Sequence, residues 1–413
     1  MRTTTRGGGN LGSGGSIPGV TDPKLALSTR AVHVPAADPV GGRPLSVPIY
    51  QTSVFAHDDA KTITDALNDP RGDFAYSRLG NPTVRALEQA MAELEGAAGA
   101  GGTASGMGAI AVALGAQLRA GAHLVVQRSI YGGTTGLLDD LVARWGLSTT
   151  EVDGDDPAAL RAALRPNTVA VYLETISNPM TVVADLPAMC AVAREAGVLT
   201  VVDSTFASPM VCRPLELGAD IVVHSATKYL SGHSDVTGGI TAYADEKHFR
   251  AGWAYAATTG VTPDPFATWL IIRGLQTLGL RMRQANSNAV ALAETLAAHP
   301  AVDRVHHPSR PDHPQHELAG RILDGYGAML SFDLAAGEHA ARAFTASVRL
   351  IQQAASLGGV ETLTVHPSST SHRSFSDEAL AAAGISRGTV RLSVGIEDPA
   401  DLVADLTQAL EQC

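Results

Sequence analysis

Short runs of β-branched and other apolar residues alternate with helical patterns through the middle of the chain, and this alternation constrains the fold more than any other feature. Helical periodicity is found, for example, over 84–97 and 186–197. Four apolar runs are spaced like the strands of βαβ units: HLVVQ (123–127), VAVYLE (169–174), VLTVVD (198–203) and DIVVHS (220–225). The pattern predicts an α/β fold in which helices cover both faces of a large, mostly parallel sheet.

Two polar residues stand where such a sheet would place a ligand. In parallel α/β sheets, ligands bind at the carboxyl ends of the strands. Asp203 ends one predicted strand, and Lys228 follows the next strand, 25 residues further along the chain. Pyridoxal phosphate needs such a pair, because a lysine amine binds it covalently and a carboxylate keeps its ring nitrogen protonated. Taken singly, the two residues would be interpreted as a helix cap and a surface amine.

Groups suited to a phosphate lie nearby in the sequence. Ser225 and Thr227 offer two hydroxyls beside Lys228, and the glycine-rich segment 101–110 opens a helical pattern. Exposed backbone N–H groups and the helix dipole favour an anion at such a helix start. Glycines also serve close helix packing, so this segment alone is weak evidence for a phosphate site.

Composition and charge exclude several other classes of protein. Lys and Arg number 30 against 41 Asp and Glu, a net charge of −11 that disfavours a nucleic-acid partner. The three cysteines (Cys190, Cys212 and Cys413) lack CxxC spacing, so neither a disulfide framework nor a thiolate metal site is predicted. No apolar run is long enough for a membrane span, and we expect a cytoplasmic enzyme.

The chain divides into regions of different composition. Residues 1–27 form a glycine-rich segment, expected to be a flexible tail. One long helix is predicted over 273–299, with a domain boundary near 275. A second, smaller α/β region follows, containing MLSFDL (329–334), a helix near 338–347 and the strand-like VRLSVGIED (390–398).

A histidine-rich stretch, RVHHPSRPDHPQHE (304–317), raises the alternative of a metal enzyme. Its prolines, and the absence of histidines at helical spacing, indicate a surface loop instead. We therefore predict no metal site.

Eight segments of the chain resemble those of the cystathionine γ-synthase-like, or Cys/Met-metabolism, pyridoxal-phosphate enzymes. They span about residues 28 to 411 and occur in the family's order: YSRLGNPT (76–83), ASGMGAI (104–110), YGGT (131–134), ETISNP (174–179), DSTFASP (203–209), HSATKYLSGHSDVTGG (224–239), SLGGVETL (356–363) and VRLSVGIED (390–398). The resemblance implies fold type I. It also implies an N-terminal arm (28–75) that contributes to a neighbouring subunit, a cofactor domain (76–275) and a C-terminal domain (276–413).

The resemblance assigns roles at the cofactor. Lys228 becomes the lysine that binds pyridoxal phosphate, Asp203 the partner of its ring nitrogen, and Tyr131 the ring that stacks on it. The phosphate would be held by the backbone of Gly106 and Met107 and by Ser225 and Thr227.

Further roles concern the substrate and the partner subunit. Arg391 would bind the substrate α-carboxylate, because its planar guanidinium donates two parallel hydrogen bonds. Asn178 and Ser356 match positions near the cofactor oxygen and the substrate carboxylate. Tyr76 and Arg78 would reach the phosphate in a neighbouring subunit, which implies a homodimer or homotetramer.

The family's chemistry is elimination or replacement at the γ-carbon of an amino acid. Lys228, once released by the substrate, would act as a base on Cα, and Tyr131 would serve as acid or base near the leaving group. A catalytically dead binding protein is the other alternative. Retention of Lys228, Asp203, Tyr131 and Arg391 together argues against it.

Departures from the family pattern rank the possible reactions. Relatives acting on a second carboxylate often carry an arginine where this chain has Gly136, and many methionine γ-lyases carry a cysteine where it has Gly133. Glu361 occurs in several activities and discriminates poorly. We rank γ-elimination on methionine or homocysteine first. The alternatives are γ-replacement on an acyl-homoserine and cystathionine γ-lyase activity.

Overall fold

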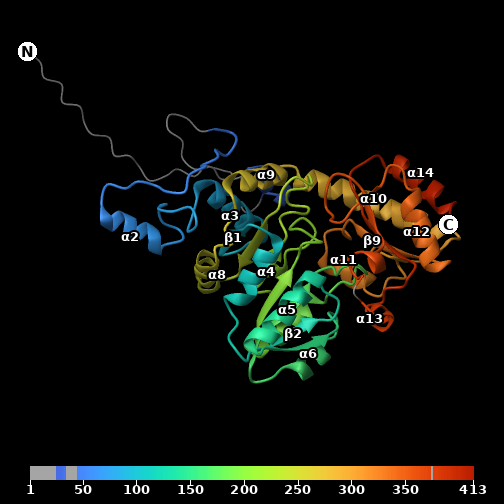
Figure 1. Ribbon diagram of the computed structural model, residues 1–413, viewed down its shortest axis with the longest axis horizontal. Coiled ribbons are helices and arrows are strands. Elements are labelled where there is room, and N and C mark those ends of the chain that lie inside the picture. Colours follow the sequence, from blue (N-terminus) through green and yellow to red (C-terminus); the bar gives the residue numbers. More distant parts are fainter. Residues whose placement is uncertain (1–24, 34–43, 374) are drawn as a thin grey trace, which may run out of the picture.

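The computed structural model describes residues 25–33, 44–373 and 375–413. Figure 1 shows a large α/β domain from which the segment bearing α2 (Ala60–Asn68) projects, and a smaller domain formed by the C-terminal part. Most of the glycine-rich tail predicted over 1–27 lies outside the described residues. No helix within the described ranges is long and apolar enough to cross a membrane.

The large domain is built on a mostly parallel sheet, as predicted. In the described chain its strand order is β1-β7-β6-β5-β4-β2-β3. The neighbouring strands from β6 to β3 run parallel, whereas β7 is antiparallel to both β1 and β6. The strand bounds are β1 Gly99–Thr103, β2 His123–Gln127, β3 Ser148–Val152, β4 Thr168–Glu174, β5 Leu199–Asp203, β6 Ile221–His224 and β7 Gly239–Tyr243.

Sequence patterns located the central strands but missed the antiparallel edge. The runs at 123–127, 169–174, 198–203 and 220–225 correspond to β2, β4, β5 and β6. β1 has the sequence GAGGT, which lacks the apolar side chains that mark a strand. Glycine is required at Gly99 because a Cβ there would lie 2.7 Å from the ring of Phe249. Close packing of α8 (Glu246–Thr259), which carries Phe249, thus removed the apolar sequence signal of this strand.

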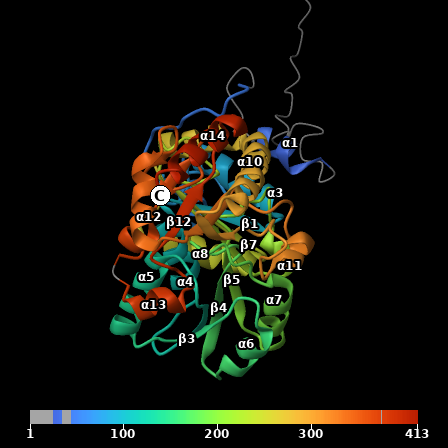
Figure 2. The same cartoon turned by 90° about the vertical axis from the view of Figure 1, so that its right-hand side faces the viewer.

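Two helical layers cover the sheet, and each encloses a separate core. On one face, α4 and α5 pack over side chains such as Leu124, Val126 and Val201. On the other face, α3 and α7 pack over Val125, Val171 and Val202. Figure 2 shows the sheet lying between these two layers. The helices are α1 Leu27–Val32, α3 Pro82–Glu95, α4 Gly106–Gly115, α5 Gly132–Trp145, α6 Pro157–Ala163, α7 Leu186–Glu195, α8 Glu246–Thr259 and α9 Pro265–Leu275, with the 3-10 helix η1 Pro214–Leu217.

The single helix predicted over 273–299 is wrong, because two helices occupy this region. α9 ends at Leu275 and α10 (Leu278–Ala298) begins three residues later. The carbonyl of Gly274 accepts hydrogen bonds from the Thr277 hydroxyl at 3.2 Å and from Arg281 Nη2 at 2.7 Å. These side chains replace part of the helical ladder, and a helical pattern alone cannot reveal that.

The small domain has a second, mainly antiparallel sheet, ordered β10-β11-β12-β9-β8 in the described chain. Its strands are β8 Val302–His306, β9 Met329–Leu334, β10 Gln352–Gln353, β11 Leu363–Val365 and β12 Thr389–Ser393. The helices are α11 His316–Ile322, α12 Gly337–Ser347, α13 Asp377–Ala382 and α14 Pro399–Leu410, with the 3-10 helix η2 Pro367–Ser369. α10 joins the two domains, since its side chains belong to both cores.

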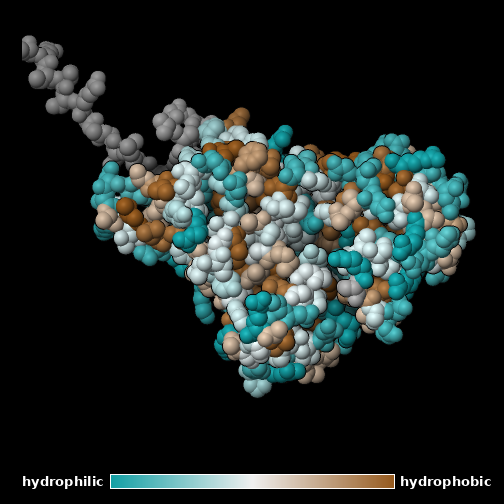
Figure 3. All heavy atoms as spheres, viewed as in Figure 1, coloured by the Kyte–Doolittle hydropathy of each residue, from teal (hydrophilic) through white to brown (hydrophobic). Residues whose placement is uncertain are grey.

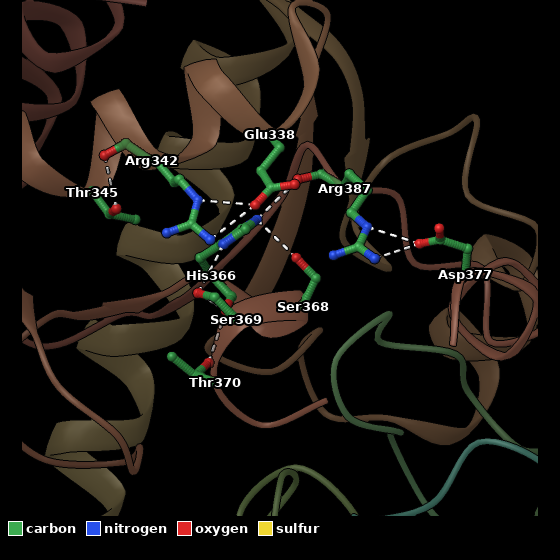
Figure 4. A network of polar contacts seen from close by, with 9 residues as sticks. All are labelled: Glu338, Arg342, Thr345, His366, Ser368, Ser369, Thr370, Asp377 and Arg387. Atoms are coloured by element: carbon green, nitrogen blue, oxygen red, sulfur yellow. Dashed lines mark hydrogen bonds and ion pairs between the residues drawn. The ribbon is translucent and has the colours of Figure 1, made fainter. Parts of the chain in front are cut away.

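A polar network fixes the loop that follows β11. The ring of His366 contacts the Ser368 and Ser369 hydroxyls and the carbonyl of Arg387 at 2.8–2.9 Å. Beside it on α12, Glu338 binds Arg342 at 2.9 Å (Figure 4). β11 pairs with β12, which carries Arg391. The network therefore lies next to the strand whose arginine is predicted to bind the substrate carboxylate.

Candidate active site

Two carboxyl groups lie side by side at the ends of neighbouring parallel strands. Glu174 ends β4, Asp203 ends β5, and the two residues are register partners. Burial raises the pKa of both groups, and the charge of Asp203 adds to the effect on Glu174. Neither carboxyl forms an ion pair within the described chain. A buried acidic pair of this kind suits a ligand that brings its own positive charge.

Glu174 was not predicted as a site residue, although it lies in the quoted ETISNP segment. Its Oε1 accepts a hydrogen bond from the backbone N–H of Tyr131 at 2.6 Å, and its carboxyl also faces the N–H of Asn178. It therefore connects two residues that were predicted. Its position at a strand end was an available signal, the same one that identified Asp203.

Lys228 lies beside the loop that carries Ser356. Its Nζ donates a 2.7 Å hydrogen bond to the Ser356 hydroxyl. Desolvation, with a smaller contribution from the nearby charge of Arg391, lowers the pKa of Lys228 to about 8. Ser356 has a φ of 106°, a conformation that costs free energy for a residue other than glycine. The amine is thus partly neutral near physiological pH and able to act as a nucleophile or base.

Arg391 is buried without a carboxylate partner among the described residues. Its Nη1 donates to Asn178 Oδ1 at 2.9 Å and its Nη2 to the carbonyl of Ser356 at 3.0 Å. The third donor, Nε, is buried and has no hydrogen-bond partner in the described part of the chain. Burial lowers the pKa of this guanidinium to about 10. A buried cation held by neutral groups is suited to receiving an anion.

The glycine-rich turn and the loop after β6 meet closely. A Cβ on Gly106 would lie 2.6 Å from Ser225 Oγ, so only glycine allows this approach. Thr227 Oγ1 accepts from the backbone N–H of Gly238 at 3.0 Å. Gly106 is the first residue of α4, whose N-cap Ser105 accepts from the N–H of Gly108. Hydroxyls and a helix N-terminus therefore converge in an arrangement that can hold a phosphate.

Tyr131 precedes α5 and exposes about half of its surface, 47%. Its ring occupies the space beside Gly133, where a Cβ would lie 2.4 Å from the Tyr131 ring and 3.0 Å from Met107 Sδ. The absence of a side chain at Gly133 therefore sets where this aromatic ring lies.

Tyr76 and Arg78 make their contacts with the arm and with α8. The backbone of Tyr76 bridges Val54 of the arm, and Arg78 stacks over the Tyr76 ring at 5.5 Å. Arg78 Nη1 also donates to the carbonyl of Ala257 at 2.5 Å. Within the described residues, no hydrogen bond joins this pair to Lys228 or Asp203.

The histidine-rich stretch is only partly the surface loop predicted from its prolines, because Asp312 and Pro314 are exposed whereas two of its histidines are buried. His307 has no exposed surface and His313 only 7%, and burial lowers the pKa of each to about 4. His306, at the end of β8, binds Asp333 of β9 at 2.7 Å. The regular structure of β8 ends at His306, and the segment that follows combines exposed residues such as Pro311 and Pro314 with the buried histidines. No cluster of potential metal ligands occurs in the described ranges.

Comparison with known proteins identifies the class. Residues 28–411 match the family described as Cys/Met metabolism PLP-dependent enzyme. The chain therefore belongs to this family, and it is a pyridoxal-phosphate enzyme of fold type I.

Relatives within the family have different activities. The chain is 42% identical to an L-methionine gamma-lyase of Porphyromonas gingivalis, covering 94% of this chain and 98% of the relative. It is 44% identical to a cystathionine gamma-synthase of Mycobacterium bovis, covering 93% and 96% respectively. The crystal structure of a cystathionine gamma-synthase from Xanthomonas oryzae, in complex with aminoacrylate and cysteine, superposes with a TM-score of 0.88. That pair is 41% identical, with 94% of this chain and 98% of the other covered.

The described residues fit pyridoxal phosphate. Asp203 and Glu174 provide buried acidity for a protonated ring nitrogen, and Lys228 provides an amine of lowered pKa. The close approach of Gly106 to Ser225 places the N-terminus of α4 beside the Ser225 hydroxyl, an arrangement that can hold a phosphate.

Proposed function

We propose that the protein catalyses γ-elimination on a sulfur amino acid, converting methionine or homocysteine to 2-oxobutanoate, ammonia and a thiol. The proposal rests on the absence of a side chain at Gly136. It is exposed on α5, and a Cβ placed there would have no atom within 4 Å. This position therefore offers no cation to a second carboxylate, whereas a thioether or thiol has no charge to be satisfied.

Each chain residue has a defined task in this reaction. Arg391 orients the substrate by its α-carboxylate, and Lys228 removes the proton from Cα. Tyr131 exchanges a proton near the departing sulfur. Asp203 holds the ring nitrogen, and Ser225, Thr227 and the backbone of Gly106 and Met107 hold the phosphate. When bound, pyridoxal phosphate supplies an electron sink that stabilises negative charge at Cα.

Gamma-replacement on an acyl-homoserine is the second candidate. The relatives named cystathionine gamma-synthase, at 44% identity, favour it as much as the relatives named methionine gamma-lyase favour elimination. Cystathionine γ-lyase activity is the remaining alternative. These reactions share the same groups at Cα and differ in the leaving group and in whether a new nucleophile adds, so a substrate comparison separates them.

The proposal includes a homodimer or homotetramer in which Tyr76 and Arg78 serve a neighbouring subunit. Support comes from the absence, among the described residues, of a hydrogen bond between this pair and Lys228, and from the apolar surface of the preceding arm. Leu45 and Val54 of the arm, and Ile63 and Leu67 on α2, are exposed. Figure 3 shows apolar side chains at the surface over α2. A cytoplasmic location agrees with the free thiols of the buried residues Cys190 and Cys212.

The test is to incubate the purified holoenzyme separately with methionine, homocysteine, cystathionine and acyl-homoserines plus cysteine. Release of 2-oxobutanoate and formation of thioether products are both measured. We expect the highest kcat/KM for 2-oxobutanoate release from methionine or homocysteine. Efficient joining of cysteine to an acyl-homoserine, with little turnover of methionine or homocysteine, would instead establish the replacement reaction.

A further inference from the structure

Three neighbouring strands of the small domain form hydrogen bonds to one turn of the large domain. The turn connects the bridged residues Ile176 and Val183 and is closed by the hydrogen bond from Thr181 N–H to the Ser177 carbonyl at 3.0 Å. It contains Asn178, which binds the guanidinium of Arg391. The placement of this turn therefore affects the predicted carboxylate site directly.

The strand residues that contact this turn form a single row across the small sheet. Arg391 of β12 pairs with Ser331 of β9, and Ser331 pairs in turn with His306 of β8. The row contacts the turn at three points: Arg391 Nη1 to Asn178 Oδ1 at 2.9 Å, Ser331 Oγ to the Pro179 carbonyl at 2.7 Å, and Thr181 Oγ1 to the His306 carbonyl at 3.1 Å. The pairing register of β12, β9 and β8 thus places one residue of each strand against a different residue of the turn.

Ser331 occupies the middle of this row and is fully buried. Its neighbours Leu330 and Phe332 point to the opposite face of β9 and form the small-domain core. Ser331 instead directs its hydroxyl at the large domain. In the part of the chain that the structure describes, no other donor reaches the Pro179 carbonyl. Loss of the hydroxyl would leave this buried acceptor unpaired.

The turn is held in a conformation that it would not adopt freely. Thr181 has a φ of 55°, which is unfavourable for a β-branched residue. Such a conformation persists where surrounding contacts determine it. The contacts at Asn178, Pro179 and Thr181 hold the turn against the small sheet.

We propose that Ser331 is a positioning residue for the substrate carboxylate. By fixing the Pro179 carbonyl it fixes the adjacent Asn178 amide, and Asn178 in turn orients the guanidinium of Arg391. This inference rests on the proposed role of Arg391 in binding that carboxylate. Ser331 itself does not touch the substrate. Replacing Ser331 should therefore weaken only the binding of ligands that carry the α-carboxylate bound by Arg391.

The test compares two unreactive probes on the holoenzyme, L-norleucine and L-norleucinamide, which differ in the α-carboxylate. Binding is followed by the absorbance of the cofactor, and the ratio of the two dissociation constants reports carboxylate recognition. Ser331→Ala should weaken L-norleucine binding about three- to tenfold, the effect of losing one hydrogen bond, and leave L-norleucinamide binding unchanged. Ser331→Cys, which conserves volume, should do the same. Ser331→Thr, which keeps the hydroxyl, should restore the ratio.

A matched control removes another buried hydroxyl from the small domain. Thr345 of α12 donates to the carbonyl of Arg342 at 3.1 Å and does not contact the turn (Figure 4). Thr345→Ala should leave the ratio unchanged. If Ser331→Ala and Ser331→Cys weaken both probes equally, or if Thr345→Ala shifts the ratio as they do, Ser331 has only a general structural role and the inference fails.

Arg391→Ala separates this inference from the proposed function. If Arg391→Ala leaves the ratio unchanged, the carboxylate role of Arg391 fails, and the inference falls with it. If Arg391→Ala abolishes discrimination and Ser331→Ala does not affect it, only the positioning role is wrong. In the double variant, Ser331→Ala should have no further effect on the ratio, because it acts through Arg391.

Discussion

Lys228 and Ser356 are joined by a 2.7 Å hydrogen bond from Nζ to Oγ across 128 positions of sequence. The same loop residue gives its carbonyl to Arg391 at 3.0 Å. Ser356 therefore contacts both the lysine proposed to react and the arginine proposed to bind the substrate. Its φ of 106° shows that the loop backbone is held in place against its intrinsic preference.

The lowered pKa of Lys228 predicts how the apoprotein captures its cofactor. Only the neutral amine attacks the aldehyde of pyridoxal phosphate, so the capture rate should rise with pH and level off above about 8. Below that pH, each further unit should reduce the rate about tenfold. Stopped-flow absorbance measures the profile. A midpoint near 10.5, the ordinary value for lysine, would show that burial does not affect this amine. Lys228→Ala serves as the control and should show no capture and no turnover.

The close approach of Gly106 to Ser225 predicts the effect of one added methyl group. In Gly106→Ala the new Cβ would lie 2.6 Å from Ser225 Oγ and 3.0 Å from its Cα. The N-terminus of α4 and Ser225 must therefore move apart at the predicted phosphate site. Overpacking of this kind costs about 1–3 kcal/mol, which corresponds to a loss of cofactor affinity of about five- to 150-fold. Titration of the apoprotein with pyridoxal phosphate measures it. Gly136→Ala, where a Cβ meets no neighbour, is the matched control and should bind normally.

Much of the large domain was predictable because its central strands are buried on both faces. Such strands appear in the sequence as short apolar runs, and their ends indicated where Asp203 and Lys228 belong. β1 and the break between α9 and α10 were not predictable. Each depends on a contact with another element, through Phe249 or Arg281, that leaves no periodic signal.

Site residues were predictable where the residue type itself implies the chemistry. They were not predictable where a residue acts by positioning another residue. An aspartate at a strand end and a lysine just beyond the next strand suggest a cofactor, and an arginine in a segment that resembles the family's suggests a carboxylate. Ser331 is an ordinary hydroxyl in MLSFDL, and its significance depends on the register that pairs it with Arg391. The burial of His307 is a similar case, because packing buried this side chain within a polar, proline-rich stretch that is otherwise partly exposed.

Arg391 predicts a specific loss of substrate binding. Removing its charge-assisted contacts to a carboxylate should cost about 1.5–3 kcal/mol, or roughly ten- to 150-fold in kcat/KM. Arg391→Lys keeps the charge but loses the planar pair of donors, so it should be impaired as well. Steady-state kinetics and cofactor content are measured together. The proposed role is wrong if Arg391→Ala releases the cofactor and leaves substrate affinity intact.

The proposed role of Arg78 at a neighbouring subunit's site predicts complementation between subunits. Arg78→Ala and Lys228→Ala should each be inactive alone. Mixed under conditions that exchange subunits, they should regain part of the activity, because each hybrid dimer contains one site with both residues intact. Sedimentation at the assay concentration provides the second measurement. A fully active monomer, or hybrids without any activity, would contradict a shared site.

Gly136 predicts that substrate preference can be redirected by a single side chain. Gly136→Arg would introduce a guanidinium at an exposed helical position where a Cβ meets no neighbour, so the backbone tolerates the change. A charge-assisted bond to a distal carboxylate contributes about 1.5–3 kcal/mol, enough to shift relative kcat/KM about tenfold or more toward cystathionine or succinylhomoserine. Gly136→Met, of similar length but uncharged, is the matched control and should not favour the dicarboxylate substrates. Competition between methionine and cystathionine in one assay measures the ratio directly. An unchanged ratio in Gly136→Arg would mean that the distal end of the substrate lies elsewhere, and the argument from Gly136 for methionine or homocysteine would then be lost.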